Sequence, residues 1–145
     1  MSVPAVRPAA VGDAAAIAAL AQARPYTARW SLAACVEEIS SSDSVFVVAA
    51  DDRLRGYAHA RVVNRDCRLF DLASAEDGGG CGRALLSALT LTAKARGCVK
   101  VSFEVSAANA RALAFYAKAG AKVVGRRPKF YNDGSDAVLM DLDLP

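Results

Sequence analysis

The segment that decides the fold is Asp77-Gly78-Gly79-Gly80-Cys81-Gly82-Arg83, which is followed by the helical pattern Ala84-Leu85-Leu86-Ser87-Ala88-Leu89. Before it lies Leu69-Phe70-Asp71-Leu72-Ala73, whose apolar character predicts a strand. A strand, a glycine turn and a helix in this order present free backbone N–H groups at a helix N-terminus, where anions are stabilised. Glycine has no Cβ, so its backbone can turn sharply and approach a ligand closely. The segment therefore predicts a site for a phosphate-bearing ligand.

The composition predicts one globular domain over residues 1–145, because 54% of the residues are hydrophobic. A formal net charge of +3 gives no argument for nucleic acid as a direct partner. The apolar runs are too short to span a membrane and the N-terminus has no signal-peptide core, so we expect a cytoplasmic protein. The four scattered cysteines contain no C-x-x-C pair, and we expect them to be reduced thiols that hold no metal.

The order of the other elements predicts a mixed sheet. We expect strands at 3–8, 45–50, 56–63, 69–73 and 99–105, a final hairpin of 121–130 with 137–144 around Asn132-Asp133-Gly134, and helices at 13–23 (capped by Asp13), 31–39 (capped by Ser31), 84–97 and 109–119. The strand–helix–strand crossover around the glycine loop implies that its two strands pair in parallel, whereas the earlier strands form an antiparallel meander. The fold class is therefore α/β (α+β), with a mostly antiparallel sheet of about seven strands and helices on both faces.

The glycine loop fails the better-known phosphate-binding motifs. A P-loop requires Lys-Ser/Thr after its last glycine, and this chain has Arg83-Ala84 there. A dinucleotide-binding fingerprint would require a glycine where Arg83 stands. What remains is a shorter signature, a polar residue followed by x-x-Gly-x-Gly, over Asp77 to Gly82. That signature alone leaves open a flexible turn that binds nothing.

Three polar residues after the loop strengthen the prediction of a site. Glu104 alternates with Phe103 and Val105 on its strand, where a solvent-facing charge is the plainer interpretation. Asn109 and Tyr116 lie two turns apart on one helix and share a face, although an N-cap and a core aromatic would explain each of them singly. Their occurrence together, in this order after the loop, favours a catalytic site.

The later part of the chain carries a family likeness in six short segments. They are Phe103-Glu104-Val105-Ser106, Ala114-Phe115-Tyr116, Ala119-Gly120-Ala121, Gly125-Arg126-Arg127, Phe130-Tyr131 and Asp136-Ala137-Val138-Leu139-Met140, with Trp30-Ser31 nearer the start. Together with the loop they resemble the GNAT superfamily of acetyl-CoA-dependent N-acetyltransferases, and within it the RimI type, the ribosomal-protein-alanine N-acetyltransferases. The likeness covers nearly the whole chain and is looser before Val45. It implies a GNAT-like sheet with a parallel strand pair at the cofactor cleft.

The resemblance also implies a role for each site residue. The strand before the loop would splay from the next one, and the backbone of Leu72, Ala73 and Ser74 would bond the pantetheine arm of acetyl-CoA. The amides of Gly78, Gly79, Gly80, Cys81, Gly82 and Arg83 would hold the pyrophosphate, and Asn109 would contact the cofactor from the other side. Glu104 matches the general base and Tyr116 the general acid. No cysteine is needed as a nucleophile, and we expect a thiol reagent at Cys81 to block cofactor binding.

The expected acceptor is a protein N-terminal α-amino group, with a ribosomal protein as the implied partner. A terminal amine has a pKa of about 8 against about 10.4 for lysine, so it loses its proton more readily. Tyr26, Trp30, Phe130 and Tyr131 are candidates for the walls of the substrate groove, with ordinary packing as the alternative. His59 is expected at the surface or in a groove. We expect a monomer or homodimer.

Two further functions stay open at this point. One is acylation of a small-molecule or lysine amine, and the other is a CoA-binding or interaction module with little catalysis. The second is motivated by the start of the loop, since the family usually has Arg or Gln where this chain has Asp77 and a longer approach where it has Ser74-Ala75-Glu76. An aspartate about 8 Å from a pyrophosphate costs up to about 2 kcal/mol at an effective dielectric of about 20. Arg83 is the candidate to compensate that charge.

Overall fold

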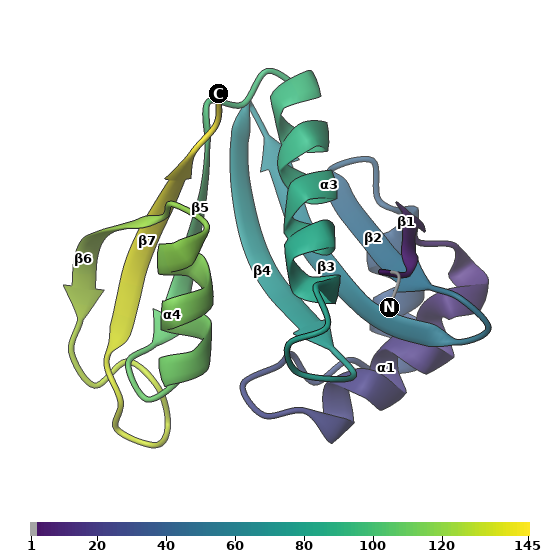
Figure 1. The fold of residues 1–145 in the computed structure, drawn as a ribbon, viewed down its shortest axis with the longest axis horizontal. Coiled ribbons are helices and arrows are strands. Elements are labelled where there is room, and N and C mark those ends of the chain that lie inside the picture. The colour runs from purple at the N-terminus through teal and green to yellow at the C-terminus, as the bar shows by residue number, and fades with distance from the viewer. Residues whose placement is uncertain (1–2) are drawn as a thin grey trace.

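A seven-stranded sheet with the order β1-β2-β3-β4-β5-β7-β6 forms the centre of the computed structural model, which describes residues 3–145. The strands are β1 (Ala5–Pro8), β2 (Ser44–Ala50), β3 (Leu54–Val63), β4 (Asp66–Ser74), β5 (Lys100–Ser106), β6 (Lys122–Arg127) and β7 (Ala137–Asp143). The helices are η1 (Val11–Asp13), α1 (Ala14–Ala23), α2 (Leu32–Ser40), α3 (Cys81–Ala95) and α4 (Ala110–Lys118). The predicted mixed α/β fold is confirmed (Figure 1).

The strands β4 and β5 are the parallel neighbours of the sheet, and they separate soon after they meet. Their pairing consists of Cys67↔Val101 and Arg68↔Ser102. Beyond these pairs the two strands diverge, so that the sheet opens into two parts (Figure 1). Within the described residues, the edge of β4 from Leu69 to Ser74 that faces β5 has no strand partner. The splay that the resemblance implied is therefore present, and it leaves backbone hydrogen-bonding groups free along a gap.

A β-bulge lies in β4 beside this gap. His59 pairs with Asp71 and Ala60 with Leu69, so Phe70 is the extra residue. A bulge shifts the alternation of side chains by one position. As a result Leu69 packs on the α3 side of the sheet, whereas Asp71 lies buried on the α1 side.

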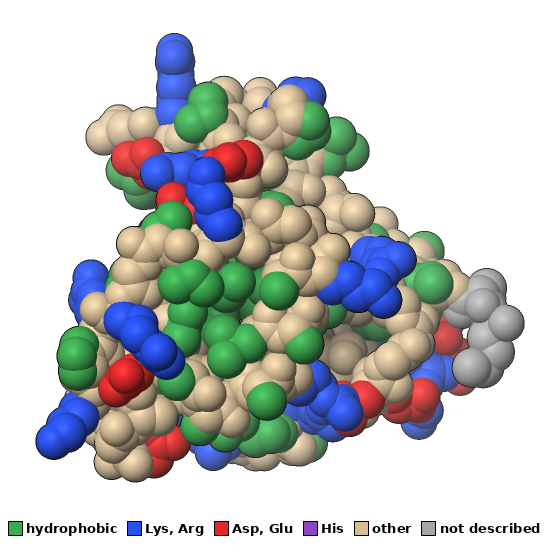
Figure 2. Space-filling model, turned by 60° about the vertical axis from the view of Figure 1, so that its left-hand side comes forward, with side chains coloured by type: hydrophobic (Ala, Val, Ile, Leu, Met, Phe, Trp, Pro, Cys, Tyr) green, Lys and Arg blue, Asp and Glu red, His purple; other side chains and the backbone are tan. Residues whose placement is uncertain are grey.

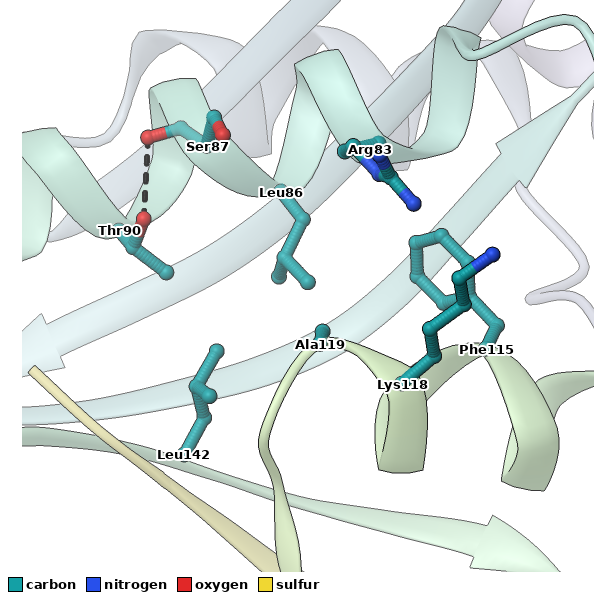
Figure 3. A pocket seen from close by; sticks show the side chains of 8 residues that line it. All are labelled: Arg83, Leu86, Ser87, Thr90, Phe115, Lys118, Ala119 and Leu142. Atoms are coloured by element: carbon teal, nitrogen blue, oxygen red, sulfur yellow. Dashed lines mark hydrogen bonds between the residues drawn. The ribbon is translucent and has the colours of Figure 1, made fainter.

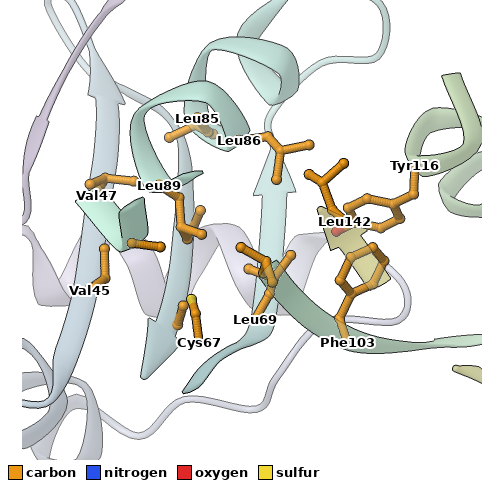
Figure 4. Packing of buried hydrophobic residues seen from close by; sticks show 14 of the residues in the cluster. Val45, Val47, Cys67, Leu69, Leu85, Leu86, Leu89, Phe103, Tyr116 and Leu142 are labelled. Carbon is orange, nitrogen blue, oxygen red and sulfur yellow. The ribbon is translucent and has the colours of Figure 1, made fainter. Parts of the chain in front are cut away.

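Each face of the sheet has its own hydrophobic cluster. Leu85 and Leu89 of α3 pack with strand residues such as Val45 and Leu69, and the cluster continues to Tyr116 of α4 (Figure 4). On the opposite face, α1 and α2 pack in the cluster of Ile17, Ala21, Cys35, Phe46, Val48 and Tyr57. The glycine loop and α4 therefore lie on one face, and α1 with α2 on the other.

The starts of the helices confirm one predicted cap and correct another. The Ser31 hydroxyl accepts a hydrogen bond from Ala34 N at 3.1 Å, as expected for the cap of α2. Asp13 precedes α1 but does not cap it, because its carboxylate accepts from Ala10 N at 2.7 Å and pairs with Arg7 at 2.8 Å. That carboxylate stabilises the turn η1 instead.

The final hairpin is wider than predicted. Pairing between β6 and β7 ends at Arg127↔Ala137, so residues 128–136 form a long connection rather than a tight turn at 132–134. This connection carries Phe130 and Tyr131. Among the helices of residues 3–145, none is long and apolar enough to cross a membrane.

Candidate active site

A groove of about 1490 Å³ follows the open edge of β4 and ends at the glycine loop. It exceeds the size of about 300–1000 Å³ that suits drug-sized ligands, so a longer molecule fits. The groove brings together every predicted cofactor residue, namely Leu72, Ala73, Ser74, Gly78, Gly79, Gly80, Cys81, Gly82, Arg83 and Asn109, and with them Tyr116. Residues far apart in the sequence thus line one surface.

The loop is shaped to present backbone amides to this groove. Gly78 and Gly80 have φ angles of 82° and 80°, a region that favours glycine. The first helical hydrogen bond of α3 runs from Ala84 N to Gly80 O at 3.1 Å. Gly80 is the N-cap residue and has no side chain to occupy the amides of the first turn. Those amides remain available to an anionic ligand.

Cys81 contributes its backbone to the loop but turns its thiol away from it. The side chain is 7% exposed, and Sγ lies 3.6 Å from Arg55 O beneath the loop. Burial raises the pKa of this thiol. The thiol is therefore poorly accessible to a reagent in the folded protein, and the block of cofactor binding by a reagent at Cys81 stays a prediction.

Tyr116 reaches the groove from α4 with its ring packed in the core. The ring centroid lies 4.3 Å from that of Phe103 and 5.1 Å from that of Phe115. Burial raises the pKa of Tyr116 well above that of a free phenol, and the charge of Asp71 adds to the rise. The hydroxyl therefore keeps its proton at any ordinary pH, and Tyr116 is one of the residues that line the groove.

Asn109 combines the two roles that its sequence position allowed. It is the N-cap of α4, where its Oδ1 accepts a hydrogen bond from Ala112 N at 3.2 Å. The residue also lines the groove on the side opposite the glycine loop. This capping hydrogen bond fixes the orientation of the Asn109 side chain, and its Nδ2 group is thereby held in one position.

Glu104 lies on the other face of the sheet and does not line this groove. Its neighbours Phe103 and Val105 pack toward α3 and α4, so alternation turns Glu104 away from them. Oε1 pairs with Arg68 at 2.7 Å and with Arg127 at 3.8 Å. Only 13% of the side chain is exposed, so the interpretation as a solvated charge does not hold.

The four candidates for the substrate groove lie in different places. Tyr26 lines the groove, and its hydroxyl donates to Ala108 O at 3.4 Å. Trp30 packs with Phe46 at a centroid distance of 5.7 Å, in the cluster beneath α1 and α2. Phe130 and Tyr131 lie on the β6–β7 connection, and burial together with the charge of Glu104 raises the pKa of Tyr131. These two aromatic residues thus accompany Glu104 rather than the loop.

Asp71 is a buried acid that sequence reasoning left unassigned. It is 6% exposed, and its Oδ2 accepts hydrogen bonds from the Tyr57 hydroxyl, from Trp30 Nε1 at 3.3 Å and from Ala28 N at 3.2 Å. Burial raises the pKa of this carboxyl group. Its signal in the sequence was a charged residue inside an apolar strand. It fixes the segment between α1 and α2 to the bulge of β4.

Two arginines in the groove also escaped the sequence reading. Arg24 follows α1 and Arg111 stands in the first turn of α4, and both form ion pairs with Asp77. These partners, rather than Arg83, compensate the aspartate at the start of the loop. No local pattern could have indicated them, because each pair joins distant parts of the chain.

A smaller pocket of about 400 Å³ continues the groove between α3 and α4 (Figure 3). Leu86, Phe115 and Leu142 give it an apolar floor, and Arg83 and Lys118 reach toward its end near Phe115 (Figure 3). On the face drawn in Figure 2, hydrophobic side chains gather in a hollow with separate basic side chains around it. An apolar surface with a cationic border suits a ligand that joins rings to phosphates.

Comparison with known proteins identifies the family. Residues 15–121 match the model of the acetyltransferase (GNAT) family. The [ribosomal protein bS18]-alanine N-acetyltransferase of Salmonella typhimurium is 34% identical over 102 residues, which are 67% of this chain and 69% of that protein. The crystal structure of the ribosomal-protein-S18-alanine N-acetyltransferase from Escherichia coli matches with a TM-score of 0.84 and 27% identity, over 97% of this chain and 93% of that one. That of the paia N-acetyltransferase from Thermoplasma acidophilum, in complex with coenzyme A, matches with a TM-score of 0.80 and 20% identity, over 99% of both chains. The chain therefore belongs to the GNAT family of acetyltransferases.

Proposed function

We propose that this acetyltransferase moves the acetyl group of acetyl-CoA to a protein N-terminal α-amino group, with the N-terminal alanine of a ribosomal protein as its acceptor. The observation that carries the proposal is the placement of Tyr116 and Glu104 on opposite faces of the sheet at the splay of β4 and β5. The names of the Salmonella and Escherichia coli proteins support the choice of acceptor. A ribosomal acceptor also implies a cytoplasmic enzyme.

The groove fits a CoA molecule in its chemistry. The unpaired edge of β4 offers backbone N–H and C=O groups to a pantetheine arm, as a neighbouring strand would. The amides at the start of α3 suit a pyrophosphate. Acetyl-CoA would supply an activated thioester carbonyl, and the free N–H groups of β4 would polarise it. Asn109 would hold the arm from the α4 side.

Tyr116 is the residue that we assign as the proton donor to the departing thiolate. An ordinary phenol and thiol differ by about 1.5 pKa units, or about 2 kcal/mol. Burial of Tyr116 raises its pKa and widens this difference, so an exposed thiolate would be a poor acceptor. The same low-dielectric groove disfavours a bare thiolate, which restores the driving force. Tyr116 would therefore donate its proton to the CoA sulfur only after negative charge has developed on that sulfur.

Glu104 is assigned as the base that receives the proton of the acceptor amine through a water molecule. Both of its ion pairs use Oε1, which leaves Oε2 outside them. The guanidinium groups of Arg68 and Arg127 repel a cationic amine beside them and so lower its pKa. The site therefore favours the neutral amine that attacks the carbonyl. Phe130 and Tyr131 form an aromatic wall next to this position, where the first residues of a peptide would lie.

The test is release of free CoA from acetyl-CoA in the presence of three acceptors. They are a peptide with an N-terminal alanine, the same peptide with a blocked N-terminus and an internal lysine, and a small-molecule amine. We expect the free N-terminal peptide to react fastest by kcat/KM. Faster reaction of the lysine peptide or of the small amine would replace the proposed acceptor by the corresponding alternative.

Two variants test the assigned roles. We expect Glu104→Gln and Tyr116→Phe each to lower kcat by about 10²–10⁴-fold, the range of general acid–base catalysis. The Kd for CoA should stay within about twofold, because neither change removes a group that we assign to CoA binding. Glu37→Gln, on the exposed side of α2, is the matched control and should leave both values unchanged. Undiminished kcat in either site variant would refute its role, and CoA binding without any turnover in the unmodified protein would favour a binding module.

A further inference from the structure

Asp77 joins the two walls of the groove across its open end. Its carboxylate pairs on one side with Arg24, at the end of α1, and on the other with Arg111, in the first turn of α4. Tyr26 adds a contact in the same direction, since its hydroxyl donates to Ala108 O just before α4. The glycine loop, the α1–α2 segment and the start of α4 gather at one end of the molecule (Figure 1). We call Arg24, Asp77 and Arg111 the clasp.

The clasp lies where the phosphates of a CoA molecule would lie. All three residues line the groove together with Gly78, Gly79 and Gly80. A Cβ built on Gly78 or Gly79 would meet no atom within 4 Å, so the space beside the loop is open to a ligand. A carboxylate that pairs with two guanidinium groups at this place presents two anionic oxygens to them, as a phosphate group also does.

The pairs of the clasp are only partly shielded from water. The exposed fractions of the side chains are 28% for Arg24, 44% for Asp77 and 66% for Arg111. Ion pairs with this exposure are weak and exchange partners readily. A phosphate group carries more charge than a carboxylate and accepts arginine in the same two-pronged manner. The arginines would therefore gain by moving from Asp77 to a phosphate.

We propose that Arg24 and Arg111 are phosphate ligands of CoA and that Asp77 holds them in the empty groove as an internal competitor. The inference rests on the proposed use of acetyl-CoA and assigns residues of that site. Binding of CoA breaks the two ion pairs of Asp77 and forms arginine–phosphate pairs in their place. Asp77 then weakens CoA binding in two ways, because it competes for the arginines and places a negative charge beside the phosphates.

The experiment measures the Kd of CoA by titration calorimetry for the unmodified protein and for Asp77→Asn. We expect Asp77→Asn to bind CoA about fivefold more tightly, equivalent to about 1 kcal/mol. The matched control is Asp143→Asn, which removes an exposed ion pair with Lys122 at the far end of β7 and should leave the Kd unchanged. A residue with only a structural role would lose affinity when it is changed, so a gain excludes that role.

Three further arms identify the ligands. Arg111→Gln and Arg24→Gln should each weaken CoA binding. The gain from Asp77→Asn should shrink when both arginines are also replaced, because only the direct repulsion between Asp77 and the phosphates is then left to remove. An undiminished gain in that background would refute the competition for the arginines. A titration with 3′-dephospho-CoA distinguishes the phosphates: if the effect of Asp77→Asn persists, the arginines meet the pyrophosphate, and if it is lost, they meet the 3′-phosphate. The gain should also shrink at high ionic strength, because the groups are exposed to solvent.

The outcomes separate this inference from the proposed function. If the unmodified protein binds CoA and Asp77→Asn binds equally or more weakly, the competitor role is refuted while the use of CoA stands. If neither protein binds CoA, the proposed function fails and the inference fails with it. Circular dichroism and the Tm of the free variants show whether each is folded. The rise in Tm on adding CoA gives a second measure of affinity and should be larger for Asp77→Asn.

Discussion

The substitution Gly56→Ala tests how the sheet positions the glycine loop. Gly56 lies in β3, and a Cβ on it would stand 2.8 Å from Ala73 O, 2.8 Å from Cys81 Sγ and 2.9 Å from Leu85 Cδ1. Real Cβ atoms do not approach other atoms this closely, so something must move. The first contact is with the backbone of β4, and the other two are with the first turns of α3. The methyl group would therefore push the helix that follows the loop away from the sheet.

The expected cost follows from these contacts. Overpacking a well-filled core costs about 1–3 kcal/mol, and three simultaneous clashes place Gly56→Ala near the upper value. Replacing glycine by alanine also reduces the conformational entropy of the unfolded chain, which stabilises the folded state by about 0.4–1 kcal/mol and offsets part of this cost. The net loss is then about 2 kcal/mol of unfolding free energy, which lowers Tm by about 4–8 °C in a chain of this size. CoA should also bind less tightly, because the amides at the start of α3 are displaced.

The assay is thermal and urea unfolding, followed by far-ultraviolet circular dichroism, with a titration of CoA into the folded variant. Gly79→Ala is the matched control: it lies in the loop, its φ is not in the left-handed region, and its Cβ would meet nothing within 4 Å. We expect that control to keep or slightly raise Tm. If Gly56→Ala melts within about 1 °C of the unmodified protein, the packing argument is wrong.

Three other predictions concern the buried polar groups and caps. Burial raises the pKa of Asp71 in the folded state. The stability that its neutral form provides is therefore present at low pH and is lost as pH rises through that raised pKa. Asp71→Asn should gain Tm relative to the unmodified protein as the pH rises above the ordinary carboxyl pKa of about 3.9, and a relative loss would contradict this sign. All four cysteines are buried, and burial raises the pKa of Cys35 to about 11 and that of Cys67 to about 12. A chromogenic disulfide reagent should therefore react slowly with the folded protein and quickly after denaturant is added. A rapid reaction with the folded protein would show that a thiol is exposed. Ser31→Ala should cost about 1 kcal/mol in urea unfolding through loss of the cap of α2, and an unchanged midpoint would show that the cap is dispensable.

The parts of the fold that the sequence predicted depend on local signals. Glycines mark the turn before α3, and a crossover through a helix must join parallel strands, so the β4–β5 pair followed directly. Alternation placed Glu104 opposite Phe103, which is what the structure shows. The burial of Cys81 was also within reach, because it stands one and two helical turns before Leu85 and Leu89 and shares their buried face.

Other features depend on contacts that no local pattern records. His59 was expected at the surface or in a groove, yet it is only 4% exposed. Its Nε2 lies 2.6 Å from Oε2 of Glu38 in α2. It is buried because β3 is an inner strand and because the helices α1 and α2 cover that face. The arginine partners of Asp77 were missed for a similar reason, since either arginine is an ordinary exposed cation until the chain folds. Bulges such as that at Phe70 likewise arise only when two strands pair.

The separation of β4 and β5 has a kinetic meaning. A sheet with all its strands paired would separate its two faces completely. An acetyl donor on one face and an acceptor amine on the other could then react only if a group of the enzyme carried the acetyl unit between them. Because the described parts of the two strands pair only at Cys67↔Val101 and Arg68↔Ser102, the sheet is open beyond these pairs, where we propose that the reaction takes place. With the proposed site, both substrates would be bound at once and would meet without a covalent carrier. The rate law should be that of a ternary complex, with intersecting rather than parallel lines in double-reciprocal plots, and the missing hydrogen bonds of the sheet would be the origin of that behaviour.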